Sequence, residues 1–144
     1  MGVTVQTIYL DSCIVIYLVE EHPIFFEPIK RAIAASGDAR LCISPLVELE
    51  CLVGPLKSSD ALLEADYEQF FAELSRLGIP EEIYRDAAML RAKHGVKTPD
   101  ALHVAIALYH SCTHLWTNDD RLAKAVGTFA VNVLAGVQTD PLAP

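Results

Sequence analysis

Three acidic residues stand where predicted secondary-structure elements begin or end, positions at which α/β proteins place functional groups, and a fourth lies on a neighbouring helix. Asp11 follows a run rich in β-branched residues, Asp100 opens an apolar helical segment, and Asp119 follows a short strand pattern. Glu50 lies on the helix expected after the second strand. Carboxylates that converge on one edge of a sheet repel one another and need a cation. Clustered carboxylate oxygens suit Mg²⁺ or Mn²⁺, and the chemistry they would serve is metal-assisted hydrolysis of a phosphodiester.

Each of these acids also has a purely structural explanation. Asp11 and Asp119 could cap the helices that follow them, and Asp100 could be a first-turn partner of the helix dipole. Glu50 could be a solvated helix residue, as Glu48 is expected to be. For any one acid alone the structural interpretation is favoured, whereas the four together favour a metal site.

The hydrophobic pattern alternates strands and helices along the chain, so these acids have a framework to position them. Strands are expected at 3–10, 40–44, 114–117 and 129–134, with a turn or short strand at 78–80. Helices are expected at 12–19, 23–35, 45–52, 58–77, 81–94, 98–108 and 121–126. Gly54 and Pro55 are expected to end the helix that begins at Pro45, and Thr98 is expected to be an N-cap. This order predicts an α/β fold with a mostly parallel central sheet flanked by helices.

Length and composition indicate one globular domain over residues 1–144, with 135–144 as a frayed tail. The formal net charge of −8 argues against non-specific binding of nucleic acid by charge alone. It does not exclude an enzyme of nucleic acids whose acids hold metal. No signal peptide or membrane-spanning run is recognisable, and the cysteines form no C-x-x-C pair. We therefore expect a cytoplasmic protein with reduced thiols.

Four ordered motifs resemble those of PIN-domain ribonucleases, most closely the VapC-type toxins of type II toxin–antitoxin pairs. They are Ile-Tyr-Leu-Asp11-Ser-Cys, Ile-Ser44-Pro-Leu-Val-Glu-Leu-Glu50-Cys-Leu-Val-Gly-Pro, Thr-Pro-Asp100-Ala-Leu-His-Val-Ala and Leu-Trp-Thr117-Asn118-Asp119-Asp-Arg121-Leu. The resemblance covers essentially the whole chain. It implies an acidic quartet that holds one or two Mg²⁺ ions, or Mn²⁺, with polar residues around it. The quartet is Asp11, Glu50, Asp100 and Asp119, and the polar residues are Ser12, Thr117 and Asn118.

The same resemblance implies a Mg²⁺-dependent endoribonuclease toxin, in which a metal-activated water attacks the phosphorus of an RNA phosphodiester. It also implies a VapB-like antitoxin as partner, and a homodimer. Candidate phosphate contacts are Arg91, Lys93, Lys97 and Arg121, for which the alternative is a solvated helix face. An apolar segment at 52–56 together with Leu62 and Leu63 is the candidate antitoxin surface, unless these residues pack onto the sheet.

Three alternatives stay open on the sequence. Glu48 and Asp120 are neighbours that could replace Glu50 and Asp119. His103 is expected to be a packed or hydrogen-bonded helix residue rather than a base. The rival function is a PIN-fold module that binds RNA or a partner without cutting.

Overall fold

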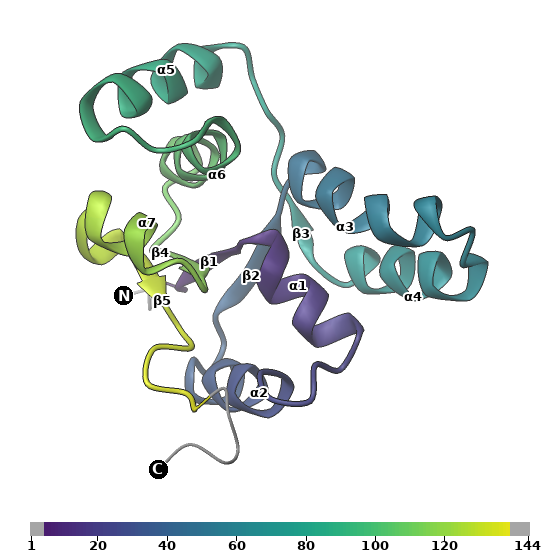
Figure 1. Ribbon diagram of the computed structural model, residues 1–144. Coiled ribbons are helices and arrows are strands. Elements are labelled where there is room, and N and C mark those ends of the chain that lie inside the picture. The colour runs from purple at the N-terminus through teal and green to yellow at the C-terminus, as the bar shows by residue number, and fades with distance from the viewer. Residues whose placement is uncertain (1–4, 139–144) are drawn as a thin grey trace.

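The computed structural model describes residues 5–138, which fold around a five-stranded sheet (Figure 1). The strands are β1 (Thr7–Leu10), β2 (Arg40–Ile43), β3 (Ser75–Arg76), β4 (His114–Thr117) and β5 (Ala130–Asn132). Their order across the sheet is β3-β2-β1-β4-β5, and every pairing between these described strands is parallel. The expected α/β fold with a parallel central sheet is therefore confirmed.

Seven α-helices and one 3₁₀ helix connect the strands within the described residues. They are α1 (Ser12–Val19), α2 (Phe26–Ala35), α3 (Pro45–Lys57), α4 (Ala61–Ala72), α5 (Glu82–His94), α6 (Thr98–Tyr109), α7 (Asp120–Ala125) and η1 (Gly127–Phe129). Helix α1 packs against α2, α3 and α4, whereas α5 packs along α6 (Figure 1). Since crossovers between parallel strands are right-handed, α1 to α4 cover one face of the sheet and α5 to α7 the other. None of the helices within residues 5–138 is long and apolar enough to cross a membrane.

The strand order reverses direction between β1 and β4, and this reversal determines where a site can form. From β1 the chain moves outward to β2 and β3, then returns to the other side of β1 as β4. The two strands end level, because Leu10 pairs with Trp116 and the Asp11 amide donates to the Trp116 carbonyl at 3.0 Å. In open α/β sheets, ligands bind beyond the carboxyl ends of the strands at such a reversal.

The core lies on both faces of the central strands. Ile8, Tyr9 and Leu10 of β1 are all buried, with no alternation of buried and exposed positions. A strand in the middle of a parallel sheet is covered on both faces, which explains the continuous run. Helix α6 was predicted to be buried, and its residues 103–107 are indeed all buried, His103 among them.

Helix α3 is longer than the sequence predicted. We expected Gly54 and Pro55 to end it, but the helix continues to Lys57. Proline in the last turn removes only the hydrogen bond that its own nitrogen would donate, so the cost there is local. The Pro55 ring is buried, and the Ser58 amide donates to the Gly54 carbonyl at 3.1 Å. Packing of the ring therefore offsets the lost hydrogen bond.

The expected helix at 58–77 is shorter, and its end is a strand. Asp60 caps α4 by accepting from the Leu63 amide at 3.0 Å, and the helix ends at Ala72. Residues Ser75–Arg76 form β3 instead, and the Leu77 amide donates to the Ile43 carbonyl at 2.7 Å. The expected turn or strand at 78–80 thus lies just after the real one. Pairing with the edge of β2 outweighs the local helix pattern.

Smaller corrections concern element ends. Thr98 is the first residue of α6 rather than its N-cap, which is Lys97 and makes no side-chain capping bond. The described part of strand one is Thr7–Leu10, and the last strand is Ala130–Asn132. Part of the expected tail forms a turn, in which the Ala135 amide donates to the Asn132 carbonyl. Residues 139–144 lie outside the described part.

Candidate functional site

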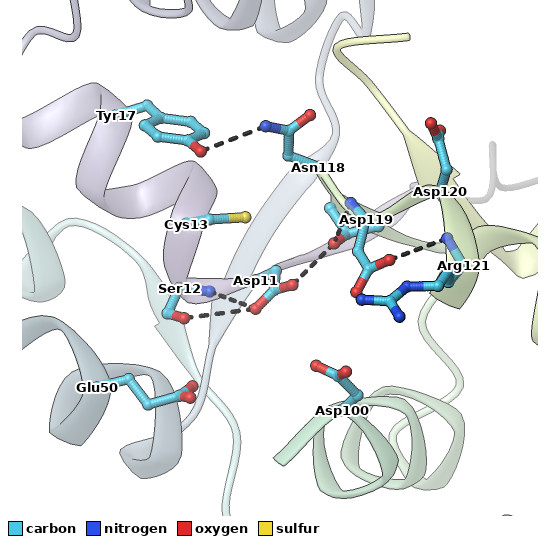
Figure 2. A pocket seen from close by; sticks show the side chains of 11 residues that line it. Asp11, Ser12, Cys13, Tyr17, Glu50, Asp100, Asn118, Asp119, Asp120 and Arg121 are labelled. Atoms are coloured by element: carbon cyan, nitrogen blue, oxygen red, sulfur yellow. Dashed lines mark hydrogen bonds between the residues drawn. The ribbon is translucent and has the colours of Figure 1, made fainter. Parts of the chain in front are cut away.

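A cavity of about 520 Å³ opens at the carboxyl ends of β1 and β4. The four predicted acids all line it, and they come from four separate parts of the chain (Figure 2). Asp11 follows β1, Glu50 lies on α3, Asp100 in the first turn of α6, and Asp119 just after β4. The fold therefore brings together carboxylates that are far apart in the sequence.

Asp11 is the most enclosed of the four, with 8% of its surface exposed. Its Oδ1 accepts from the Ser12 amide at 2.7 Å, and its Oδ2 accepts from the Thr117 hydroxyl at 2.8 Å. These two bonds fix the carboxylate plane at the junction of β1 and α1. Asp11 is also the N-cap of α1, so its structural and chemical roles coexist.

The segment after β4 holds the second carboxylate. Asp119 caps α7, because its Oδ1 accepts from the amides of Arg121 and Leu122 at 2.9 and 3.2 Å. Its own amide donates to the Thr117 hydroxyl at 3.2 Å, so Thr117 links Asp119 to Asp11. Asn118 lines the cavity but donates to the Tyr17 hydroxyl at 3.3 Å instead of reaching the acids (Figure 2).

The two neighbouring acids that could have replaced members of the quartet have other partners. Glu48 accepts two bonds from the Arg76 guanidinium, whose Nη2 lies 2.7 Å from its Oε2, and this pair joins α3 to β3. Asp120 lines the rim of the cavity, but its carboxylate accepts from Asn132 at 2.6 Å and points away from the other acids (Figure 2). The geometry thus favours Glu50 and Asp119 over them.

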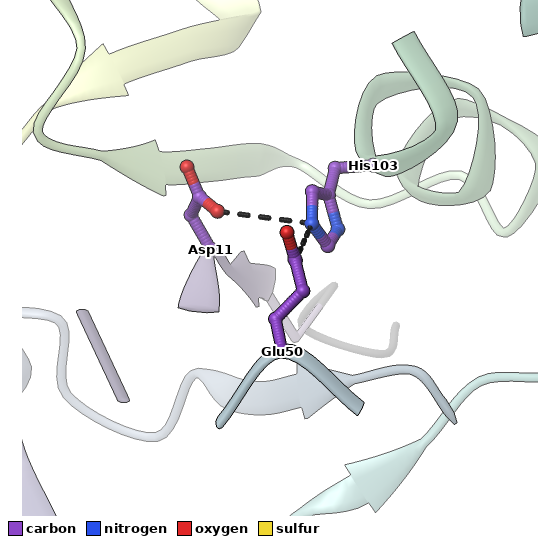
Figure 3. Close-up of side chains that lie close together, drawn as sticks. All are labelled: Asp11, Glu50 and His103. Carbon is purple, nitrogen blue, oxygen red and sulfur yellow. Dashed lines mark hydrogen bonds and ion pairs between the residues drawn. The ribbon is translucent and has the colours of Figure 1, made fainter. Parts of the chain in front are cut away.

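His103 lies beside Asp11 and Glu50 and belongs to the same cluster. Its Nε2 lies 2.5 Å from Glu50 Oε1 and 3.8 Å from Asp11 Oδ1, and its side chain is only 1% exposed (Figure 3). Suitable ligand atoms of Asp11, Glu50 and His103 lie within 4.8 Å of one another. The expectation that His103 is a hydrogen-bonded helix residue holds, but its partners are the site acids.

A buried chain of hydrogen bonds supports this histidine. Its Nδ1 lies 2.7 Å from the Tyr9 hydroxyl, which in turn lies 2.7 Å from Ser44 Oγ. Burial raises the pKa of the Tyr9 hydroxyl far above its usual range, so the hydroxyl keeps its proton. With Ser44 donating to Tyr9, and Tyr9 donating to Nδ1, the Nε2 proton is directed at Glu50. This buried chain of hydrogen bonds, which includes Tyr9 of β1, therefore orients the Glu50 carboxylate.

The pKa values of Asp100 and Glu50 are shifted in opposite directions by their surroundings. Burial raises the pKa of Asp100, and the negative charges of Asp11 and Asp119 raise it further. Burial would also raise the pKa of Glu50, but hydrogen bonds from His103 and Ser12 outweigh it, and its pKa is lowered. The negative charge of Asp100 is thus less compensated than that of Glu50. That is the behaviour expected of a site built for a cation.

The nearby thiol is not a nucleophile. Cys13 lines the cavity, and burial together with the charge of Asp11 raises its pKa to about 12. A thiol must be deprotonated to attack, so Cys13 is inert at neutral pH.

The structure separates the four predicted phosphate contacts. Arg121 lines the acidic cavity, and Lys97 lines a second cavity beside it. Lys93 faces a different pocket on α5 and α6, and Arg91 donates to the Val96 carbonyl at 3.1 Å. Only Lys97 and Arg121 therefore border the acids.

Tyr17 lines the cavity and was missed on the sequence. Tyr17 lies four residues after Cys13, so the two share a face of α1, and this spacing was the available signal. His103 was recognised on the sequence as a hydrogen-bonded helix residue, but its bond to Glu50 was not predicted.

Replacing His103 by Leu is expected to weaken both the fold and the site. The change removes one of the two hydrogen bonds of the buried Tyr9 hydroxyl, which keeps its bond to Ser44, and we expect this loss to cost about 1 kcal/mol of unfolding free energy. It also removes the hydrogen bond that orients Glu50. Loss of a residue that orients a metal ligand typically weakens metal binding at least about tenfold, so we expect a tenfold weaker affinity for Mg²⁺. Urea denaturation and calorimetric titration measure the two effects. His94→Leu, an exposed change of the same kind, is the control and should alter neither. Unchanged stability and affinity in His103→Leu would contradict the positioning role.

Comparison with known proteins agrees with this architecture. The chain shares its fold with a toxin–antitoxin complex from Klebsiella pneumoniae at 22% identity and a TM-score of 0.72, over 87% of this chain and 96% of that one. VapBC2 from Rickettsia felis, solved on a DNA fragment from its promoter, matches at 16% identity and a TM-score of 0.74, over 88% and 98%. VapC20 from Mycobacterium tuberculosis, a toxin that cleaves the sarcin–ricin loop, matches at 14% identity and a TM-score of 0.69, over 83% and 95%.

Sequence comparison identifies the family. No curated protein sequence matches the chain significantly. The family model of the PIN domain matches residues 8–127, which include the whole acidic site. This protein therefore belongs to the PIN-domain family.

Proposed function

We propose that this protein is a metal-dependent endoribonuclease and the toxin of a toxin–antitoxin pair. The observation that carries the proposal is the convergence of Asp11, Glu50, Asp100 and Asp119 on one open cavity. Structural acids are normally spread over the surface or paired with cations. Here burial and, after it, the charges of Asp11 and Asp119 raise the pKa of Asp100.

The residues of the cavity fit a divalent cation. Carboxylate oxygens are the donors that Mg²⁺ and Mn²⁺ prefer. Asp11, Glu50, Asp100 and Asp119 would hold it, with Ser12 and Thr117 orienting Asp11. The chemistry that such a cation supplies is to lower the pKa of a water and to neutralise charge on the phosphate.

The protein's own residues supply the rest of the reaction. The bonds to Ser12 and Thr117 hold Asp11 in one orientation, and His103 holds Glu50, so little reorganisation is needed when the substrate arrives. Arg121 lies on the rim beside Asp119, where its guanidinium can bind a phosphate of the RNA strand. The open cavity admits a flexible single strand, whose phosphodiesters can enter the site.

The toxin assignment rests on the fold shared with toxin–antitoxin proteins and on an exposed apolar stripe. Leu49, Val53 and Leu56 lie on one side of α3 with 61%, 55% and 58% of their surfaces exposed. Leu62 at the start of α4, the helix that packs against α3, is 83% exposed, whereas Leu63, which we had grouped with it, is half-buried. We propose that an amphipathic helix of a VapB-like antitoxin covers this stripe. Because Glu50 is on the same helix, a basic antitoxin side chain could then reach the acids.

The proposed homodimer would use a different surface. Tyr84 and Met89 on α5, with Leu108 and Tyr109 on α6, expose about half or more of their surfaces. These two helices pack together on the other face of the sheet from α3. We propose that a second copy covers this pair of helices, which leaves the α3 stripe free for the antitoxin.

Metal-dependent cleavage is the direct test. We expect the purified chain to cut single-stranded RNA internally in Mg²⁺ or Mn²⁺, and to lose all cleavage in excess EDTA. Electrophoresis of an end-labelled RNA measures both, and restoring Mg²⁺ after EDTA is the control for irreversible damage. RNA binding without cleavage in any divalent metal would instead support the rival, a module that binds without cutting.

A further inference from the structure

A second cavity of about 220 Å³ adjoins the acidic one and has no role in the function proposed so far. Its residues come from the turn between α5 and α6 and from α7. That turn is sharply defined, because Gly95 has a positive φ of 68° and ends α5 in the left-handed conformation. Arg91 holds the turn by donating to the Val96 carbonyl at 3.1 Å. The cavity is therefore bounded by ordered backbone.

The lining has two chemically distinct parts. Val96, Leu122 and Ala125 form an apolar part, which is suited to a flat apolar surface. Lys97 and Arg121 are cations at the edge, although the chain as a whole has a net charge of −8. An apolar surface bordered by cations fits a nucleotide, whose base is apolar on its faces and whose phosphate is anionic.

The second cavity is continuous with the acidic cavity. Asp100, Asp119 and Arg121 line both. A strand whose phosphodiester lies at the acids would thus place a neighbouring nucleotide in the second cavity, with Arg121 between the two.

We propose that this second cavity is the binding site for one nucleotide next to the cleaved phosphodiester. This inference rests on the proposed nuclease function and names the part of the protein that reads the RNA. Its volume of about 220 Å³ is below the roughly 300–1,000 Å³ of pockets that hold drug-sized ligands, which suits a single base. The base packs on Val96, Leu122 and Ala125. The His94 ring, on the same lining, is the group on which it can stack.

Filling the cavity tests the proposal. Ala125→Phe places a ring where the base would lie, and we expect it to weaken binding of a short single-stranded RNA about tenfold, as measured by fluorescence anisotropy in EDTA. In Mg²⁺, KM should rise by a similar factor and the preferred cleavage sequence should change. The thermal shift produced by Mg²⁺ should stay as in the wild type. Ala92→Phe, at an exposed position of α5, is the matched control and should change none of these.

A second variant keeps the test independent of folding. His94 is exposed, so His94→Ala should fold normally and still weaken RNA binding severalfold. If Ala125→Phe and His94→Ala both bind and cut RNA like the wild type, the second cavity is not a nucleotide site. If the wild type never cuts RNA but both variants lose binding, the nuclease proposal fails and the nucleotide site stands.

Discussion

Replacing Asp100 by Asn is expected to reduce RNA cleavage in Mg²⁺ by more than about 100-fold. Residues that merely orient metal ligands typically contribute 10- to 100-fold, so loss of a ligand carboxylate should cost more. Asn keeps the size of the side chain and a carbonyl oxygen, but removes the negative charge that faces Asp11 and Asp119. The rate of cleavage of a defined RNA at saturating Mg²⁺ measures the effect, and Asp11→Asn should behave in the same way.

The matched control is Asp86→Asn, which changes an exposed aspartate on α5 and should cleave normally. Circular dichroism should show that all three variants keep the fold. Near-wild-type cleavage by Asp100→Asn, in a preparation free of contaminating nuclease, would show that Asp100 is not part of the reacting site.

The same variant has a second readout in its stability without metal. Because the folded protein raises the pKa of Asp100 above 3.8, the ionised carboxylate destabilises the fold at neutral pH. Asp100→Asn in EDTA should therefore be more stable than the wild type at pH 7. The difference should shrink as the pH falls through the raised pKa, and vanish below the unfolded pKa, where both states bind the proton. An equal difference at every pH would contradict a destabilising ionised Asp100, whose causes are its burial and the neighbouring charges of Asp11 and Asp119.

Replacing Leu56 by Asp is expected to weaken inhibition by the antitoxin by about 30-fold or more. Leu56 lies in the exposed apolar stripe of α3, and a buried interface anchor typically contributes 2 kcal/mol or more. Since its side chain is 58% exposed in the free protein, the charge should not disturb the fold. Titration of RNA cleavage with the antitoxin measures the loss, while cleavage without antitoxin should be unchanged.

A control on the opposite surface separates the two proposed interfaces. Met89→Asp, on α5, should lower the fraction of dimer in analytical ultracentrifugation but leave antitoxin inhibition intact. If the antitoxin also covers the start of α4, Leu62→Asp should act like Leu56→Asp, because Leu62 is the most exposed leucine of the two helices. If Leu56→Asp and Leu62→Asp are both folded and fully inhibited, the antitoxin binds elsewhere.

Much of this protein could be predicted from the sequence. The local sequence pattern is sufficient to place an element where periodicity, capping residues and burial agree. Helix α1 accordingly begins at Ser12 after its Asp11 cap, and β4 spans 114–117, both as expected. The positions of the acids at element ends were likewise readable. In a parallel sheet those ends meet at one edge, so their convergence on one cavity followed from the order of the elements.

Other features depend on contacts between residues distant in the sequence. The end of α3 and the existence of β3 were decided by the burial of Pro55 and by the bond from Leu77 to Ile43. Which of Glu48 and Glu50 faces the acids was decided by Arg76, which pairs with Glu48.

The pairing of His103 with Glu50 is the clearest case of a decision made by tertiary structure. The two residues are 53 positions apart, and each has an ordinary helical environment when considered alone. Only the tertiary fold, which brings α3 and α6 from opposite faces of the sheet to the end of β1, places an imidazole against that carboxylate. Local propensity carries no information about such a contact, because its energy arises from burial and hydrogen bonds that exist only after the chain has folded.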